Sequence, residues 1–229
     1  MRITTPLTKE RLKHHLTYST WKYLLVAVLA VMGWSLIYTT TAYRSPQDKR
    51  IDLYVQTATT SSEIIDAFIK PIWEETVPEM ETVASVTLLP NDDSATAMQL
   101  STYIMAGEGD IYFLSETYFK SMASSGAFLP LEDLAADGQL NVQDIDTKKG
   151  YIAFVEEYDE KDQPVKTSQH LFGIPLDEFY GFMSGMQLDN RGMYAVILRA
   201  NQNDENVIPF FNALLQAGRG EKENWITSQ

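Results

Sequence analysis

The chain has 229 residues, no cysteine and a formal net charge of −13. Without cysteine it has no disulfide framework, no thiol chemistry and no lipid-modified cysteine anchor. Residues 1–50 hold eight Lys and Arg residues against two acidic ones, which leaves −19 for residues 51–229. So acidic a region argues against nucleic acid and anionic lipid headgroups as ligands, although the same charge also serves ordinary solubility.

An apolar segment near the N-terminus predicts a transmembrane helix. The run from Trp21 to Tyr38 carries no charge after Lys22. Its roughly 18 apolar residues are long enough to cross a bilayer and exceed the ~7–15-residue core of a cleaved signal peptide. Aromatic side chains, which favour the membrane interface, lie near both ends: Trp21, Tyr23, Trp34 and Tyr38.

The charges that flank this segment predict its orientation. Positive residues are more numerous on the N-terminal side, which places that side in the cytoplasm. We therefore expect a single-pass protein of a bacterial cell membrane in four parts: a cytoplasmic segment (1–20), a signal-anchor helix (21–41), a tether (42–50) and an extracytoplasmic α/β domain (51–229). The alternative is a long signal peptide that is cleaved near Ala42.

The exterior region alternates predicted strands and helices. Residues 51–55 are typical of a first strand, and apolar residues recur at helical spacing over 62–77, where Pro71 predicts a kink or break. A second strand over 83–89 and a helix over 95–106 follow.

Glycines punctuate the next unit. Gly107 and Gly109 predict the end of the preceding helix, because glycine adopts the positive φ found there. Residues 110–114 form a short apolar run typical of a buried strand, and 116–123 return to helical spacing before Gly126. This repeated strand–helix order predicts an α/β fold with a mostly parallel sheet flanked by helices.

The second half of the region is more polar. We expect short helices over 135–155 and a solvated hairpin or loop over the charge-rich residues 156–168. Residues 170–176 and 192–198 predict two further strands, and 206–217 predict a final amphipathic helix.

Four segments resemble the sugar-type extracellular solute-binding proteins of ABC importers. The first is the opening strand with its polar loop. Residues 105–114 resemble the family's "A-x-G-x-x-P-D-hydrophobic" strand, with Gly109 in place of the proline. Residues 126–134 resemble its "G-hydrophobic-L-x-P-L-D-D-L" turn, and 171–176 its "Y-G-I-P" segment. The resemblance implies one lobe of a periplasmic-binding-protein-like fold.

The chain departs from this family in length. Members typically carry a second lobe after the "Y-G-I-P" segment, whereas residues 179–192 form only a connector here. Residues 193–215 then resemble the family's return strand and helix. We therefore expect a single lobe with the second lobe missing, which gives a ligand one wall instead of two.

The resemblance implies a non-enzymatic, membrane-anchored binding subunit or accessory protein of an ABC-type transport system. Its expected partners are a sugar or other small polar solute, and permease subunits or another protein that completes the cleft. The alternative is a structural or regulatory interaction protein that has lost independent solute binding.

Open α/β sheets bind ligands at the carboxyl ends of their strands. Polar and aromatic side chains follow the predicted strands there, and such groups suit a sugar or another polar solute. The candidate ligand-binding residues are Thr57, Thr59, Thr60, Asn91, Asp92, Ser115, Glu116, Tyr118, Asp177 and Tyr180. The alternative is that these residues serve only as ordinary loop and helix-capping residues, as the same residue types often do.

Catalytic and metal-binding patterns have little support. Residues 133–144 match a calcium loop only in part, since Ala135 stands where an oxygen ligand is needed. The acidic run over 156–162 offers weak support for the paired carboxylates of glycoside hydrolysis, and His170 is expected to stand alone at a strand edge. We therefore expect no enzyme, no cofactor and no metal.

Overall fold

The computed structural model describes residues 9–41, 43, 45–89, 94–159, 161, 163–199 and 203–220. The chain divides into two compact units, Met1–Arg44 and Ser45–Gln229. Each unit is described by itself below.

The described residues of the first unit form a long helix, α1 (Lys9–Thr41), and Tyr43 follows it. Within it, Thr20–Thr41 has a mean hydropathy of 1.8, none of it is buried, and it is long and apolar enough to cross a membrane. Near its end, the hydroxyls of Thr39 and Thr41 donate to backbone carbonyls one turn earlier. These hydroxyls therefore need no hydrogen-bond partner outside the helix. The helix begins at Lys9, whereas the sequence predicts that the membrane segment begins at residue 21.

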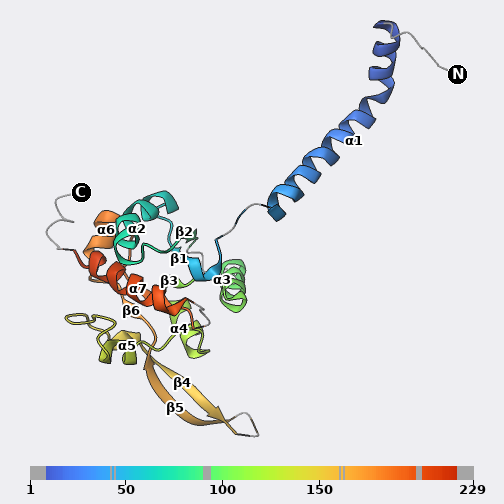
Figure 1. The fold of residues 1–229 in the computed structure, drawn as a ribbon. Helices are drawn as coiled ribbons and strands as arrows, with labels where there is room; N and C mark the ends of the chain where they lie inside the picture. The colour runs from blue at the N-terminus through green and yellow to red at the C-terminus, as the bar shows by residue number, and fades with distance from the viewer. Residues whose placement is uncertain are drawn as a thin grey trace. The chain divides into compact units, whose positions relative to one another are not determined.

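The second unit is built on a five-stranded sheet with the order β2-β1-β3-β7-β6 (Figure 1). The strands are β1 (Arg50–Gln56), β2 (Thr82–Leu88), β3 (Ile111–Ser115), β6 (Ile174–Pro175) and β7 (Met193–Ile197). Strand β1 is parallel to both β2 and β3, whereas β7 is antiparallel to β3 and to β6. The mostly parallel α/β sheet is confirmed, with β7 as its reversed strand.

Helices cover both faces of this sheet. One face packs against α2 (Ser62–Thr76), α6 (Tyr180–Gly185) and α7 (Asp204–Arg219), and the other against α3 (Ser94–Ala106) and α4 (Glu116–Ser124). Alternate residues of a strand face opposite sides. Leu53 and Val55 therefore enter the first core cluster, and Tyr54 enters the second.

The proline in α2 does not break the helix. Of the expected kink or break at Pro71, the break does not occur, because α2 runs through this residue without interruption. Pro71 and Ala67, whose carbonyl loses its helical donor, both lie on the exposed face. Water can therefore satisfy that carbonyl, and the apolar residues on the opposite face keep the helix packed.

Residues 151–171 form a separate antiparallel hairpin of β4 (Tyr151–Tyr158) and β5 (Pro164–Leu171), which projects from the lobe (Figure 1). The expectation of helices over 135–155 holds for α5 (Glu132–Ala136) and the 3-10 turn at Lys148–Gly150, but is wrong over 151–155. The strand expected over 170–176 is likewise divided between β5 and β6. Ile152 and Phe154 pack against the second core cluster, a tertiary contact that stabilises the hairpin.

Candidate functional site

The strand order creates a switch point between β1 and β3. From β1 the chain goes to β2 on one side, and later to β3 on the other side. Open α/β sheets bind ligands in the crevice outside the carboxyl ends of strands at such a point. Because β7 is reversed, the loop that precedes it reaches the same edge. We call this surface the carboxyl edge, and it comprises residues 56–60, 115–116, 177–180 and 187–192.

Threonines tie the loop after β1 to the loop before β7. The Oγ1 atoms of Thr57 and Thr59 lie 3.2 Å apart. Thr59 Oγ1 donates to the carbonyl of Gln187 at 3.0 Å and accepts from the amide of Asp189 at 3.2 Å. Thr60 Oγ1 is buried and has no hydrogen-bond partner within the described residues.

The switch point itself is bridged by a side-chain amide. Gln56 Oε1 accepts from the backbone N–H of Ser115 at 2.9 Å, which joins the ends of β1 and β3. The next amide, of Glu116, donates to the carbonyl of Gly192 at 3.0 Å. Ser115 directly precedes α4 and makes no side-chain capping hydrogen bond, and the exposed carboxylate of Glu116 pairs with Lys120. Both residues lie at the end of β3, and the Glu116 side chain is exposed there.

The loop before β7 is held by side chains of its neighbours. Asp177 Oδ1 accepts from the amide of Gly192 at 2.7 Å. Asn190 is fully buried and donates from Nδ2 to the carbonyls of Leu176 and Phe179. Arg191 contacts both carboxylate oxygens of Asp189 at 2.7 Å, and this hydrogen bonding lowers the pKa of Asp189. These contacts fix the edge as one connected surface.

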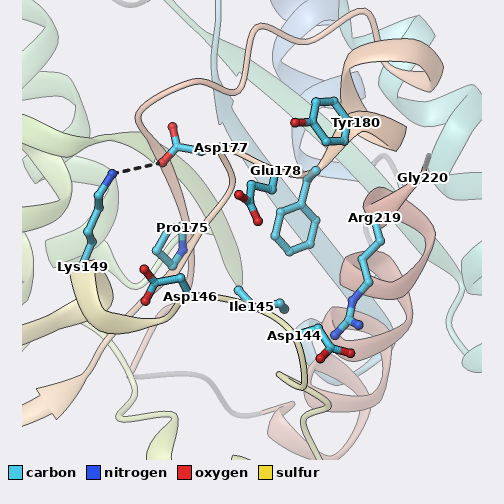
Figure 2. Close-up of a pocket in the computed structure, with 11 residues that line it drawn as sticks. Asp144, Ile145, Asp146, Lys149, Pro175, Asp177, Glu178, Tyr180, Arg219 and Gly220 are labelled. Carbon is cyan, nitrogen blue, oxygen red and sulfur yellow. Dashed lines mark ion pairs between the residues drawn. The ribbon is translucent and has the colours of Figure 1, made fainter. Parts of the chain in front are cut away.

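A cavity of about 540 Å³ opens beyond the end of β6 (Figure 2). Its walls come from the segment before β4, from the loop between β6 and α6, and from the C-terminal end of α7. Figure 2 shows the ion pair between Lys149 Nζ and Asp177 Oδ2, 3.7 Å apart, at one side of it. The lining residues are Asp144, Ile145, Asp146, Lys149, Pro175, Asp177, Glu178, Phe179, Tyr180, Arg219 and Gly220.

The predicted site residues do not all lie at one surface. The carboxyl edge holds Thr57, Thr59, Thr60, Ser115, Glu116, Asp177 and Tyr180, of which only Asp177 and Tyr180 line the cavity. Tyr118 is 7% exposed and belongs to the second core cluster. Asn91 and Asp92 lie outside the described residues.

Several residues of the edge were not expected from the sequence. Gln56 is a strand residue, and Asp189, Asn190 and Gly192 precede a strand instead of following one. Reasoning from the carboxyl ends of parallel strands therefore misses them. The polar run at 189–192, directly before the apolar β7, was the available signal.

The expectation that His170 stands alone is wrong. Its Nδ1 contacts Glu132 Oε1, and its Nε2 lies 2.8 Å from Ser168 Oγ and 3.5 Å from Glu156 Oε1. These residues join α5 to the hairpin. Within the described residues, no group of three or more His, Asp or Glu side chains is arranged to hold a metal ion.

The matches between this chain and known proteins are to solved structures. No family model matches the chain, and no curated protein matches it. Among solved structures, an extracellular solute-binding protein family 1 member from Alicyclobacillus acidocaldarius matches 58% of the chain at 18% identity and a TM-score of 0.39. An ABC substrate-binding protein from Listeria monocytogenes, in complex with cycloalternan, matches 54% at 18% identity and a TM-score of 0.38.

The neighbours are solute-binding proteins. The chain covers only 29% and 28% of the first two, and 81% of a third, the open unliganded PBP AttC of Agrobacterium tumefaciens. That third match has 11% identity over 75% of this chain and a TM-score of 0.41. All three TM-scores are below 0.5.

Proposed function

We propose that the chain is a membrane-anchored, extracytoplasmic, solute-binding-like subunit or accessory protein of an ABC-type transport system. In this proposal α1 is the anchor, residues 42–50 are the tether and the sheet domain is a non-enzymatic binding lobe. A sugar or another small polar solute, or a protein of the transport system, contacts the carboxyl edge.

The observation that carries this proposal is the convergence of polar loops at one open edge of the sheet. Loops after β1, β3 and β6 and the loop before β7 meet there. Hydrogen bonds connect them: Gln56 and Asp177 accept from backbone amides, and Thr59 donates to a backbone carbonyl. Rigid backbone combined with unpaired or exposed polar groups suits the recognition of a polar ligand. Thr60 Oγ1, buried without a partner among the described residues, is one such group.

A single lobe limits what this edge does alone. Among the described residues, no second lobe lies opposite the edge to desolvate a ligand. A small solute is therefore enclosed on one side only, and we expect weak binding to the isolated chain. A partner protein that covers the edge would supply the second wall, and anchoring in the same membrane would raise its effective concentration.

The second candidate function is a structural or regulatory interaction protein without independent solute binding. The same edge then contacts only protein. The absence of an opposing wall among the described residues favours this alternative, because affinity for a free solute depends on that wall.

Calorimetry separates the two candidates. The full-length chain in lipid nanodiscs is titrated with a panel of carbohydrates up to millimolar concentration. Saturable heat that Thr59→Val weakens, with Thr117→Val as a matched exposed control, supports solute capture at the edge. The absence of saturable heat for every solute contradicts independent capture and leaves the interaction protein as the function.

A further inference from the structure

We propose that four side chains between α5 and the β4–β5 hairpin form a pH-sensitive latch, which is closed when His170 is protonated. They touch in series: Glu132 of α5, His170 and Ser168 of β5, and Glu156 of β4. We call these four side chains the hairpin latch. The inference goes beyond the proposed function and does not depend on it, because it concerns the hairpin and not the carboxyl edge.

Glu132 connects the hairpin latch to the start of α5. Its Oε1 contacts Nδ1 of His170, and its Oε2 accepts from the backbone N–H of Leu171 at 3.1 Å. The backbone N–H of Leu131 donates to the carbonyl of Leu171 at 2.7 Å, so the backbone also holds the end of β5 here. The contact between Glu132 and His170 therefore extends this attachment outward along the hairpin.

The contacts of the hairpin latch require three hydrogens. Nδ1 of His170 contacts Glu132, Nε2 lies 2.8 Å from Oγ of Ser168, and the same Oγ contacts Oε1 of Glu156. Ionised carboxylates only accept hydrogen bonds, so the ring and the hydroxyl must supply every hydrogen. A neutral imidazole and a serine hydroxyl supply two. The protonated imidazole supplies the third, so the closed latch holds one proton more.

Each neutral tautomer of His170 leaves one contact without a hydrogen. If Nδ1 carries the hydrogen, the Ser168 hydroxyl donates to Nε2, and lone pairs of Oγ and Glu156 then face each other. If Nε2 carries it, lone pairs of Nδ1 and Glu132 face each other instead. Loss of the proton therefore weakens the hairpin latch at one end or the other.

The surroundings of the ring favour its charged form. Among the described residues, the ionisable groups within ion-pair distance of His170 are Glu132, at Nδ1, and Glu156, whose Oε1 lies 3.5 Å from Nε2. Lys166 pairs with the other oxygen of Glu156 and offsets part of its charge. The ring of Phe172 has its centroid 5.7 Å from that of His170, close enough to attract a cation.

The proton count fixes the sign of the pH dependence. Since the closed latch holds a proton that the opened hairpin releases near neutral pH, falling pH favours closure and rising pH favours opening. Histidine changes its charge between about pH 5 and 8. The side chains of His170, Glu132 and Glu156 are 25%, 30% and 27% exposed, so water screens their attraction and the effect is modest. Ile152 and Phe154 keep their apolar contacts, so pH changes how often the hairpin opens locally.

Hydrogen exchange followed by mass spectrometry tests the hairpin latch. The full-length chain in nanodiscs of zwitterionic lipid is compared at pH 6 and pH 8.5, with each rate divided by the intrinsic rate at that pH. We expect the protection of peptides that cover β4 and β5 to be about threefold to tenfold lower at pH 8.5, the effect of one or two partly exposed ion pairs. Protection of β1 should not change.

Variants assign this dependence to the hairpin latch. His170→Gln cannot titrate and should abolish it, and Glu132→Gln should reduce it. Ser168→Ala should also reduce it, because the neutral ring then satisfies Glu132 and no hydroxyl is left without a hydrogen for Glu156. Asp133→Asn is the matched control, since it removes an exposed neighbouring carboxylate of α5, and should keep the full dependence.

Three results would overturn the inference. The first is equal or higher hairpin protection at pH 8.5 in the unmodified chain, a result that needs no variant. The second is the full pH dependence in His170→Gln. The third is the full dependence in Ser168→Ala, which would contradict the proton count. If His170→Gln fails to fold, seen as lost protection of β1, the unmodified chain and Ser168→Ala decide.

Discussion

Two glycines in the turn before β3 have the same backbone conformation and different surroundings. Gly107 and Gly109 both have positive φ, of 67° and 79°. A Cβ atom at Gly107 would meet nothing within 4 Å, whereas at Gly109 it would lie 2.5 Å from Cδ2 of Tyr54. That ring cannot retreat easily, because it stacks on Tyr112 with centroids 5.0 Å apart. Glycine is thus required at position 107 for the backbone conformation alone, and at position 109 for the backbone conformation and for the space beside Tyr54.

Gly109→Ala should therefore destabilise the chain by about 2–4 kcal/mol, the combined cost of a left-handed alanine and of overpacking. Gly107→Ala should cost about 1–2 kcal/mol, from the backbone conformation alone. Thermal unfolding of the full-length chain in detergent gives both values. Equal destabilisation by the two variants would show that contact with Tyr54 does not matter.

Because of Glu156, we expect the hairpin to lose stability in acid. Hydrogen bonds from Lys166 and then Ser168 lower its pKa to about 2. A carboxylate with a lowered pKa in the folded state stabilises that state above its ordinary pKa, near 4.5, and loses this contribution as the pH falls toward 2. The unfolding temperature should fall over this window, and Glu156→Gln should remove that part of the fall.

Glu157→Gln is the control for this measurement, since it removes a neighbouring carboxylate that forms none of these contacts. Unfolding temperatures are compared between pH 5 and pH 2 for all three chains. An identical pH profile of Glu156→Gln and the unmodified chain would contradict the assignment.

At the scale of elements, the loop between β6 and β7 depends on one buried side chain. Asn190 has no exposed surface, and its Nδ2 satisfies the carbonyls of Leu176 and Phe179. These carbonyls flank the start of α6. Asn190 therefore holds together the part of the carboxyl edge that also forms the cavity floor.

Asn190→Ala should destabilise the chain by about 2–4 kcal/mol, because it leaves two carbonyls without their donor. Gln187→Gly serves as the control in the same loop. Gln187 has a φ of 55°, so glycine relieves strain there and should leave stability unchanged or slightly higher. Both are measured by thermal unfolding, and a neutral Asn190→Ala would contradict this role.

The sequence predicts those elements whose pattern is local. The strands at β1, β2 and β3 and the helices after them follow from apolar spacing and glycine positions. The hairpin follows only in part, because the sequence predicts a hairpin or loop over residues 156–168 but a helix over residues 151–155. It forms through contacts distant in the sequence: Phe154 packs so closely on Gly126 that a Cβ there would lie 2.6 Å from Cε2 of the ring.

The same distinction applies to the candidate site. Thr57, Ser115 and Asp177 could be placed at the edge because they lie at or just after the ends of strands. The contribution of residues 187–192 could not be predicted, because it depends on the direction of β7. That direction is a property of the sheet topology and leaves no local pattern in the sequence. Tyr118 was placed near the edge by its spacing from β3, but the turn of α4 directs it into the core.

At the scale of the whole molecule, the proposal requires α1 to cross a membrane with the sheet domain outside. The natural chain has no cysteine, so single cysteines report topology without background. We expect Ser124→Cys, at an exposed position of α4, to react with a membrane-impermeant maleimide in intact cells, and Thr5→Cys to react only after permeabilisation. The reverse pattern would place the domain inside the cell, and labelling of released soluble chain would favour cleavage near Ala42.

The central claim is that the carboxyl edge is the working surface of this protein in an import system. Site-specific photocrosslinking in native membranes tests it most directly, with a benzophenone amino acid at Glu116, on the carboxyl edge, or at Glu79, before β2 at the opposite edge. The account predicts adducts from position 116, and not from position 79, that contain a membrane-spanning importer subunit identified by mass spectrometry. Adducts that are the same from both positions, or that contain no importer subunit, would contradict it.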